Sequence, residues 1–186
     1  PVVLVLTAGC AVSIPELAPL VDAILYVWYP GEQGGNAVAD VIFGKTSPAG
    51  RLPVTIVKDL SQLPPFDNYN MKGRTYRFMK KAPLYRFGFG LSYATFSYSK
   101  ATLSDRTIAA GRKATVQVTV TNRSKVTADE VVQVYVRDID ASVPVPNLHL
   151  EAFQRVTLKP GQSRQLTFTL TPESFQVYDS RGNAII

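Results

Sequence analysis

A strand, a glycine-rich turn and a helix follow one another between residues 23 and 44, and they constrain the fold more than any other stretch. Residues 23–29 form an apolar run rich in branched and aromatic side chains, which is typical of a buried strand. A proline–glycine pair ends this run, and residues 36–43 then carry apolar side chains at helical spacing up to Gly44, a preferred helix cap. In open α/β sheets such a turn lies at the carboxyl end of its strand, where ligands bind.

The residues before this unit predict a second, parallel strand. Residues 2–6 are a continuous apolar run, as in strands covered on both faces. Ser13, with a glutamate three residues later, has the pattern of a helix N-cap and predicts a short helix at 14–20. Alternating strands and helices predict a right-handed crossover, and residues 51–57 are expected to add a further strand. Because these few strands cannot form an independent domain, we interpret residues 1–57 as the tail of a larger, mostly parallel α/β sheet.

The pattern changes in the second half of the chain. Residues 58–96 have weak periodicity and end in an aromatic and glycine-rich stretch, so we expect a long connecting loop. Residues 97–186 contain short strands of period two, with valines on one face in 115–122 and again in 131–136. Regular strands separated by turn signals predict an all-β sandwich. Its last strand is expected to be incomplete at the end of the chain.

Composition and charge exclude several kinds of function. The net charge of +6 is modest and gathers between Met71 and Arg86, without a nucleic-acid motif, so nucleic acid is not an expected partner. No apolar run is long enough to span a bilayer. Cys10 is the only cysteine and is expected to be buried, and His149 is the only histidine and is expected at the surface or at a strand edge. We therefore predict no disulfide, no metal site and no catalytic triad.

Four motifs in order carry a resemblance to a known family. They are VWYPGEQGGNAVADVIFG at residues 27–44, SPAGRLP at 47–53, GRTYRF at 73–78 and FGFGLSY at 87–93. Together they resemble the C-terminal half of glycoside hydrolase family 3, which contains β-glucosidases and β-xylosidases. The resemblance covers the whole chain.

The resemblance implies an enzyme made of a barrel, a three-layer α/β sandwich and a fibronectin type III-like domain. Residues 1–57 would form the end of the α/β sandwich, and residues 97–186 would form the fibronectin-like domain. Residues 58–96 would connect these two domains. The nucleophilic aspartate and the acid/base glutamate are expected upstream, so no catalytic residue is assigned in this chain. The implied substrate is a β-linked oligosaccharide or glycoside, bound through the missing domains, and hydrolysed with retention without a cofactor. The chain would dock on the barrel, and the parent enzyme would be periplasmic or secreted.

Arg74 and Tyr76 are the stronger candidates for contact with substrate. They lie in the long loop beside an aromatic cluster, and arginine offers a fixed fork of donors suited to hydroxyls and carboxylates. The alternative is that the arginines of this loop only clamp domains together.

Glu32 and Trp28 are weaker candidates, in and beside the turn after the strand. Glu32 can contact a sugar at the rim of a site, or it can only stabilise the N-terminus of the following helix. Trp28 can stack on a sugar ring, or it can belong to the core.

Two further hypotheses treat the chain as something other than part of an enzyme. In one, the sandwich is a carbohydrate-binding module, for which Tyr135 and Tyr178 are the main aromatic candidates. In the other, it is a structural module between domains. The isolated chain is predicted to be inactive in every case.

Overall fold

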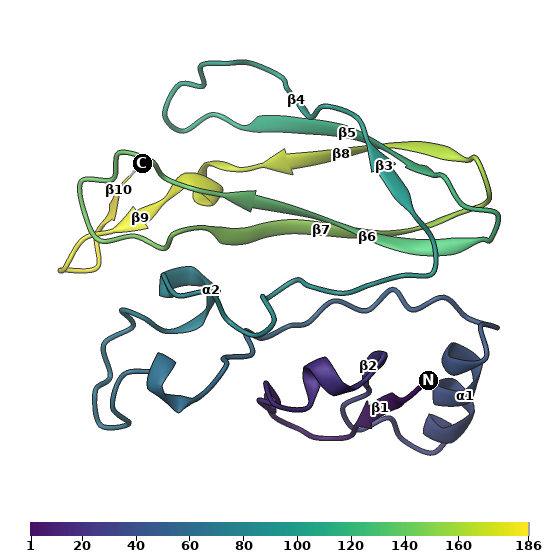
Figure 1. The fold of residues 1–186 in the computed structure, drawn as a ribbon. Coiled ribbons are helices and arrows are strands. Elements are labelled where there is room, and N and C mark those ends of the chain that lie inside the picture. Colours follow the sequence, from purple (N-terminus) through teal and green to yellow (C-terminus); the bar gives the residue numbers. More distant parts are fainter. Residues whose placement is uncertain (186) are drawn as a thin grey trace. The chain divides into compact units, whose positions relative to one another are not determined.

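The computed structural model describes residues 1–185, which form two compact units: one is Pro1–Leu91 and the other begins at Ser92 (Figure 1). The first unit contains β1 (Val3–Leu6), the 3₁₀ helix η1 (Ala18–Leu20), β2 (Ala23–Tyr26), α1 (Gly34–Ile42), the 3₁₀ helix η2 (Leu60–Gln62) and α2 (Thr75–Phe78). The second unit contains β3 (Phe96–Tyr98), β4 (Thr102–Leu103), β5 (Ala114–Asn122), β6 (Ala128–Val136), β7 (His149–Leu158), β8 (Ser163–Leu170), the 3₁₀ helix η3 (Pro172–Phe175), β9 (Val177–Tyr178) and β10 (Ala184–Ile185). A compact unit need not coincide with a domain of a larger protein, so the division predicted at residues 57 and 96 stays a prediction.

β1 and β2 form a parallel pair, as their apolar runs and the short crossover predict. The register aligns Val3 with Ala23 and Leu6 with Tyr26. Exposed and half-buried residues alternate along β1, and Val3 and Val5 are 40% and 38% exposed to solvent. This face of β1 is uncovered in the described residues, so the expected cover on both faces stays a prediction.

The helix expected at residues 14–20 is wrong, because Ser13 is used elsewhere. Its hydroxyl donates to the backbone carbonyl oxygens of Val57, at 2.8 Å, and of Lys58. No side-chain cap bond is present at the start of the turn that follows. Only the three-residue η1 forms, and Ser13 instead ties the loop after β1 to residues 57–58.

The predicted helix after the turn is confirmed as α1, and it ends as the sequence indicates. Phe43 is the C-terminal cap residue, and Gly44 follows with φ +76°. Its N–H donates to the carbonyl of Val41, which closes the helix. None of the helices described between residues 1 and 185 combines the length and the apolar character needed to cross a membrane.

The strand expected at residues 51–57 is wrong, although the segment is extended. It pairs with residues 84–89 at only two places, through Leu52 with Gly88 and Phe89, and through Ile56 with Tyr85. The position of Pro53 is compatible with this pairing, because its neighbour Leu52 faces residues 88–89 and successive residues of an extended chain point their N–H groups to opposite sides. The two segments approach closely nearby, since a Cβ on Gly90 would overlap the carbonyl oxygen of Gly50.

The second unit is a two-layer β-sandwich, as the alternating pattern predicts. In one layer β5 is central, with β8 on one edge and β3 and β4 sharing the other; β6 and β7 form the second layer (Figure 1). The core between the layers consists of Val120, Val132, Val156, Leu158, Leu166 and Phe168. All six are apolar members of the predicted strands, because alternation places every second side chain on the inner face.

Asn122 is a fully buried polar residue at the end of β5. Its side-chain amide donates to the carbonyl oxygens of Val126, at 2.8 Å, and Leu158, at 2.9 Å. Its side-chain oxygen accepts from the N–H of Ser124 at 2.8 Å. One side chain therefore satisfies three backbone groups and joins the end of β5 to β7 in the other layer.

Candidate functional site

The first unit contains a cavity of about 1100 Å³. Four segments that are distant in sequence line it: residues 11–16, residues 53–63, residues 71–79 and Phe87. The bonds from Ser13 to residues 57–58 hold the first two segments together at this place. The lining mixes apolar side chains with polar and charged ones, as in a site that takes a small polar molecule.

Arg74 lies on this cavity and organises the loop that leads to it. Its guanidinium donates to three backbone carbonyl oxygens, those of Pro65, Asn68 and Asn70, at 3.2, 2.6 and 3.3 Å. These donors are therefore engaged within the loop itself. The contacts identify Arg74 as a clamp on residues 65–70, and its predicted contact with substrate stays a prediction.

Tyr76 lies on the same cavity, in the short helix α2. Its ring stacks on Phe87, with centroids 4.1 Å apart and planes at 11°. The helix begins at Thr75, whose φ of +52° is unusual for a residue with a side chain and turns the chain sharply after Arg74. Arg74 and Tyr76, predicted together from one stretch of sequence, are thus brought together by the structure.

Trp28 lies outside the lining of this cavity, at the carboxyl end of β2. It is half-buried and has φ +53°, which ends the strand at Tyr26 rather than at the expected Tyr29. Its ring lies 4.5 Å from that of Tyr26, whose hydroxyl donates to the carbonyl of Cys10. Burial raises the pKa of the Tyr26 phenol above its usual value. Cys10 itself is exposed, so the expectation that it is buried is wrong.

Glu32 also lies outside the lining of the cavity. It is exposed and directly precedes Gln33, the N-cap of α1, and no acidic residue occupies the first turn of that helix. Its predicted contact with sugar and the alternative role at the helix N-terminus both remain untested. The acidic residues that do line the cavity are Glu16 and Asp59.

Asp59 and Glu16 were not predicted at this site, because their proximity depends on contacts between distant segments. The Asp59 carboxylate accepts from the N–H of Ser61 at 2.7 Å, and bonding to Ser61 lowers the pKa of this acid. An acid held ionised in this way is poorly suited to donate a proton. In residues 1–185 no three residues among His, Cys, Asp and Glu come together as metal ligands.

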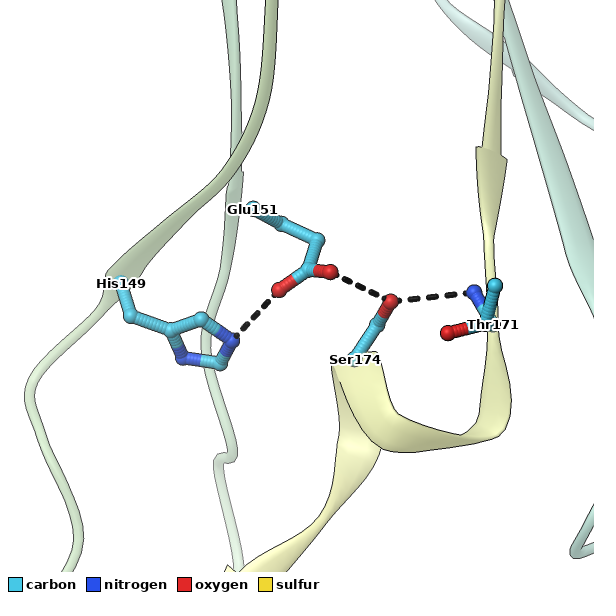
Figure 2. Close-up of polar contacts among 4 residues, drawn as sticks. All are labelled: His149, Glu151, Thr171 and Ser174. Atoms are coloured by element: carbon cyan, nitrogen blue, oxygen red, sulfur yellow. Dashed lines mark hydrogen bonds and ion pairs between the residues drawn. The ribbon is translucent and has the colours of Figure 1, made fainter.

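A second polar cluster lies in the sandwich and joins His149, Glu151 and Ser174 (Figure 2). Glu151 pairs with His149 Nε2 at 3.3 Å and accepts from the Ser174 hydroxyl at 2.7 Å. The Ser174 oxygen also accepts from the N–H of Thr171 at 3.0 Å. The fold gives His149, the first residue of β7, an acidic partner that was not predicted. Its spacing of two residues from Glu151 on one strand was the signal that pointed to the same face.

The order of these three groups excludes a serine triad. In a triad the histidine lies between serine and carboxylate and takes the proton of the hydroxyl. Here the carboxylate lies between the other two, and Ser174 is buried at 1% exposure. The cluster therefore joins β7 to η3 and has no arrangement for nucleophilic chemistry (Figure 2).

The aromatic residues expected to mark a carbohydrate-binding sandwich are only partly available. Tyr135 is half-buried, and its hydroxyl donates to the side chain of Gln133 at 2.6 Å. Tyr178 is exposed on β9, and Phe153 is exposed on β7. The hypothesis that the sandwich binds sugar stays a prediction for both tyrosines.

Comparison with known proteins follows the two units. Residues 1–93 match the glycosyl hydrolase family 3 C-terminal domain, and residues 130–186 match a fibronectin type III-like domain. A β-xylosidase of Formosa agariphila is 46% identical over 176 residues, which are 91% of this chain and 24% of that protein. A periplasmic β-glucosidase of Salmonella typhimurium is 37% identical over 97% of this chain and 25% of its own length.

Solved structures give the same result. A β-glucosidase from Erythrobacter marinus is 40% identical, with a TM-score of 0.87, and the match covers 99% of this chain and 25% of that one. A β-glucosidase from Listeria innocua in complex with isofagomine is 32% identical, with a TM-score of 0.86, over 100% of this chain and 28% of that one. This chain spans about a quarter of the length of these relatives. It belongs to glycoside hydrolase family 3, of which it represents a C-terminal part.

Proposed function

We propose that this chain is part of a β-glycosidase that removes terminal β-linked glucose or xylose from oligosaccharides or glycosides. The observation that carries the proposal is the 46% identity to a β-xylosidase over 91% of the chain. Relatives named as β-glucosidases match almost the whole chain as well. The full-length protein that contains this chain should therefore hydrolyse nitrophenyl β-xyloside or nitrophenyl β-glucoside. Absence of hydrolysis of both substrates would contradict the proposal.

The reaction proposed is hydrolysis with retention, by two carboxyl groups about 5–5.5 Å apart. Both are expected outside this chain. The resemblance to the C-terminal part of the family supports this assignment, because the chain spans only about a quarter of its relatives. The purified 186-residue chain should have no activity, and turnover of a nitrophenyl β-glycoside by that chain would show that a catalytic pair lies within it.

For the first part of the chain we propose the end of a three-layer α/β sandwich at residues 1–57, followed by a connecting segment at 58–96. The parallel pair β1–β2 and the exposed valines of β1 support this proposal, because parallel sheets are normally covered on both faces. Residues 97–186 would be a fibronectin-like domain whose last strand is incomplete. The chain would dock on the barrel of the same enzyme. Because the Salmonella relative is named a periplasmic β-glucosidase, a periplasmic or secreted location is proposed.

Arg74 and Tyr76 are proposed to shape the part of the site that holds the leaving group, with Trp28 and Glu32 as weaker candidates. Support comes from the cavity, which both Arg74 and Tyr76 line. In the full-length protein, Arg74→Ala should lower kcat/KM for oligosaccharides about tenfold, or about 1.4 kcal/mol, with a smaller effect on thermal stability. Arg86→Ala, at an exposed arginine of the same segment, is the control. A lower melting temperature with unchanged kcat/KM would leave Arg74 only as a clamp.

A further inference from the structure

The loop between Leu63 and Met71 presents two aromatic rings to solvent. Phe66 is 95% exposed and Tyr69 is 87% exposed. The residues on either side of the loop, Leu63 and Met71, both line the 1100 Å³ cavity. The loop therefore begins and ends at this cavity, and neither of its aromatic rings belongs to the lining.

The backbone of this loop is fixed by hydrogen bonds within it. Arg74 binds three of its carbonyl oxygens, as described above. Asn68 accepts from the N–H of Asn70 at 3.0 Å through its side-chain oxygen, and Asn70 accepts from the N–H of Lys72 at 2.8 Å in the same way. The rings of Phe66 and Tyr69 are thus presented by a preorganised segment, so little backbone entropy is lost when a ligand binds.

The side chains of the loop alternate between rings and planar polar groups, in the sequence Phe-Asp-Asn-Tyr-Asn from residue 66 to residue 70. The side-chain oxygens of Asn68 and Asn70 are engaged, which leaves their NH₂ groups able to donate outward. A chain of neutral sugars has the complementary chemistry, because each ring offers an apolar C–H face and a rim of hydroxyl acceptors. An interface with another domain also combines apolar and polar groups, so the experiment below distinguishes these two occupants.

We infer that Phe66 and Tyr69 form an aromatic binding site for a neutral β-linked oligosaccharide, with the amides of Asn68 and Asn70 donating to its hydroxyls. This inference rests on the proposed function for the class of ligand. The site would hold sugar units that follow the terminal one, because the rings lie beside the cavity and are not part of its lining. Arg74 is then a positioning residue, which acts through the loop backbone.

The test is direct binding of an S-linked β-1,4-xylo-oligosaccharide, whose sulfur linkages resist hydrolysis, to the full-length protein by calorimetry. The variant is Phe66→Ala/Tyr69→Ala. The control is Phe43→Ala, because Phe43 is also a highly exposed aromatic residue of the first unit, at 82%. We expect the double variant to bind at least tenfold more weakly and the control to bind as the unchanged protein does. Both proteins should keep the melting temperature of the parent.

Two results would overturn the inference. Unchanged affinity in the double variant would show that the rings do not bind sugar. A lower melting temperature in the double variant, with affinity unchanged in the fraction that remains folded, would show that the rings pack against another part of the enzyme. Binding is measured without hydrolysis, whereas the proposed activity is tested with nitrophenyl glycosides. A protein that fails the activity test can therefore be distinguished from one that fails the binding test.

Discussion

The two units of the molecule reach order by different means. The second unit has a core of six buried apolar side chains between two sheets, built on strands of eight to ten residues. The first unit buries only Ile14, Ala49 and Ile56 among its apolar residues. It relies on single polar contacts between distant segments, such as those of Ser13 and Arg74. A unit that builds its own core is stable by itself, whereas a unit held by polar contacts depends on its surroundings for burial.

The largest effect that separates the two units is expected from core truncation. Leu158→Ala removes a side chain with 0% exposure and should lower the free energy of unfolding of the second unit by about 3–4 kcal/mol. Ile56→Ala in the first unit should cost roughly half as much, because Ile56 lines the cavity and its neighbours can relax toward it. Hydrogen exchange measured separately for each unit gives both values. Equal costs would mean that the first unit is packed as tightly as the second.

A second substitution asks how far the sandwich depends on one polar group. Asn122→Ala leaves the buried carbonyl of Leu158, the partly buried carbonyl of Val126 and the N–H of Ser124 without their partner, and should destabilise the second unit by about 2 kcal/mol. Gln165→Ala, at an exposed position of β8, is the control and should change stability by less than about 0.5 kcal/mol. Chemical denaturation followed by circular dichroism measures both. If the two variants behave alike, Asn122 does not hold the layers together.

Two glycines of the first unit allow a finer test. Gly44→Ala forces a side chain into the left-handed conformation at φ +76° and should cost about 1 kcal/mol. Gly35→Ala, within α1 and with open space around it, should stabilise by about 0.5–1 kcal/mol. The melting temperatures should therefore move in opposite directions. A shift of the same sign in both variants would argue against the observed end of α1.

The smallest effect expected is a dependence on pH in the second unit. A hydrogen bond from the Thr157 side chain, and then Arg155, hold the pKa of Asp129 below its usual range. A carboxyl group with a lowered folded pKa contributes stability above its unfolded pKa of about 4 and loses it as pH falls through the folded pKa. Asp129→Asn should therefore reduce the loss of stability below pH 4, by less than about 1 kcal/mol. An unchanged pH profile would exclude this contribution.

Strand positions in the sandwich could be predicted from sequence, because one face is buried and alternation of two is a local signal. The helix α1 was predictable from the helical spacing of its apolar residues, and its end was predictable from the glycine at position 44. The helix expected at residues 14–20 was not formed, because Ser13 binds a segment more than forty residues away, and no local pattern reports such a contact. The extended segment at 51–57 was predictable, whereas its pairing with residues 84–89 at only two places depends on a segment about thirty residues away.

The candidate site was predictable only where its residues are neighbours in sequence. Arg74 and Tyr76 lie two residues apart and share one cavity. Glu16 and Asp59 line the same cavity because their segments fold together. Since they are far apart in the sequence, no local pattern could assign them to one site. The pairing of His149 with Glu151 was accessible from their spacing on one strand, whereas the contribution of Ser174 required the fold.

The close approach of Gly90 to Gly50 has a consequence for variation within the motif at residues 87–93. Gly88 is required for its backbone conformation, with φ +77°, which asparagine and aspartate also tolerate. Gly90 is required for space, because the carbonyl oxygen of Gly50 occupies the place of any Cβ. A saturation library at the two positions should therefore recover glycine, asparagine and aspartate at 88 and glycine alone at 90. The two glycines of this motif are therefore required for two different physical reasons, backbone conformation at position 88 and space at position 90.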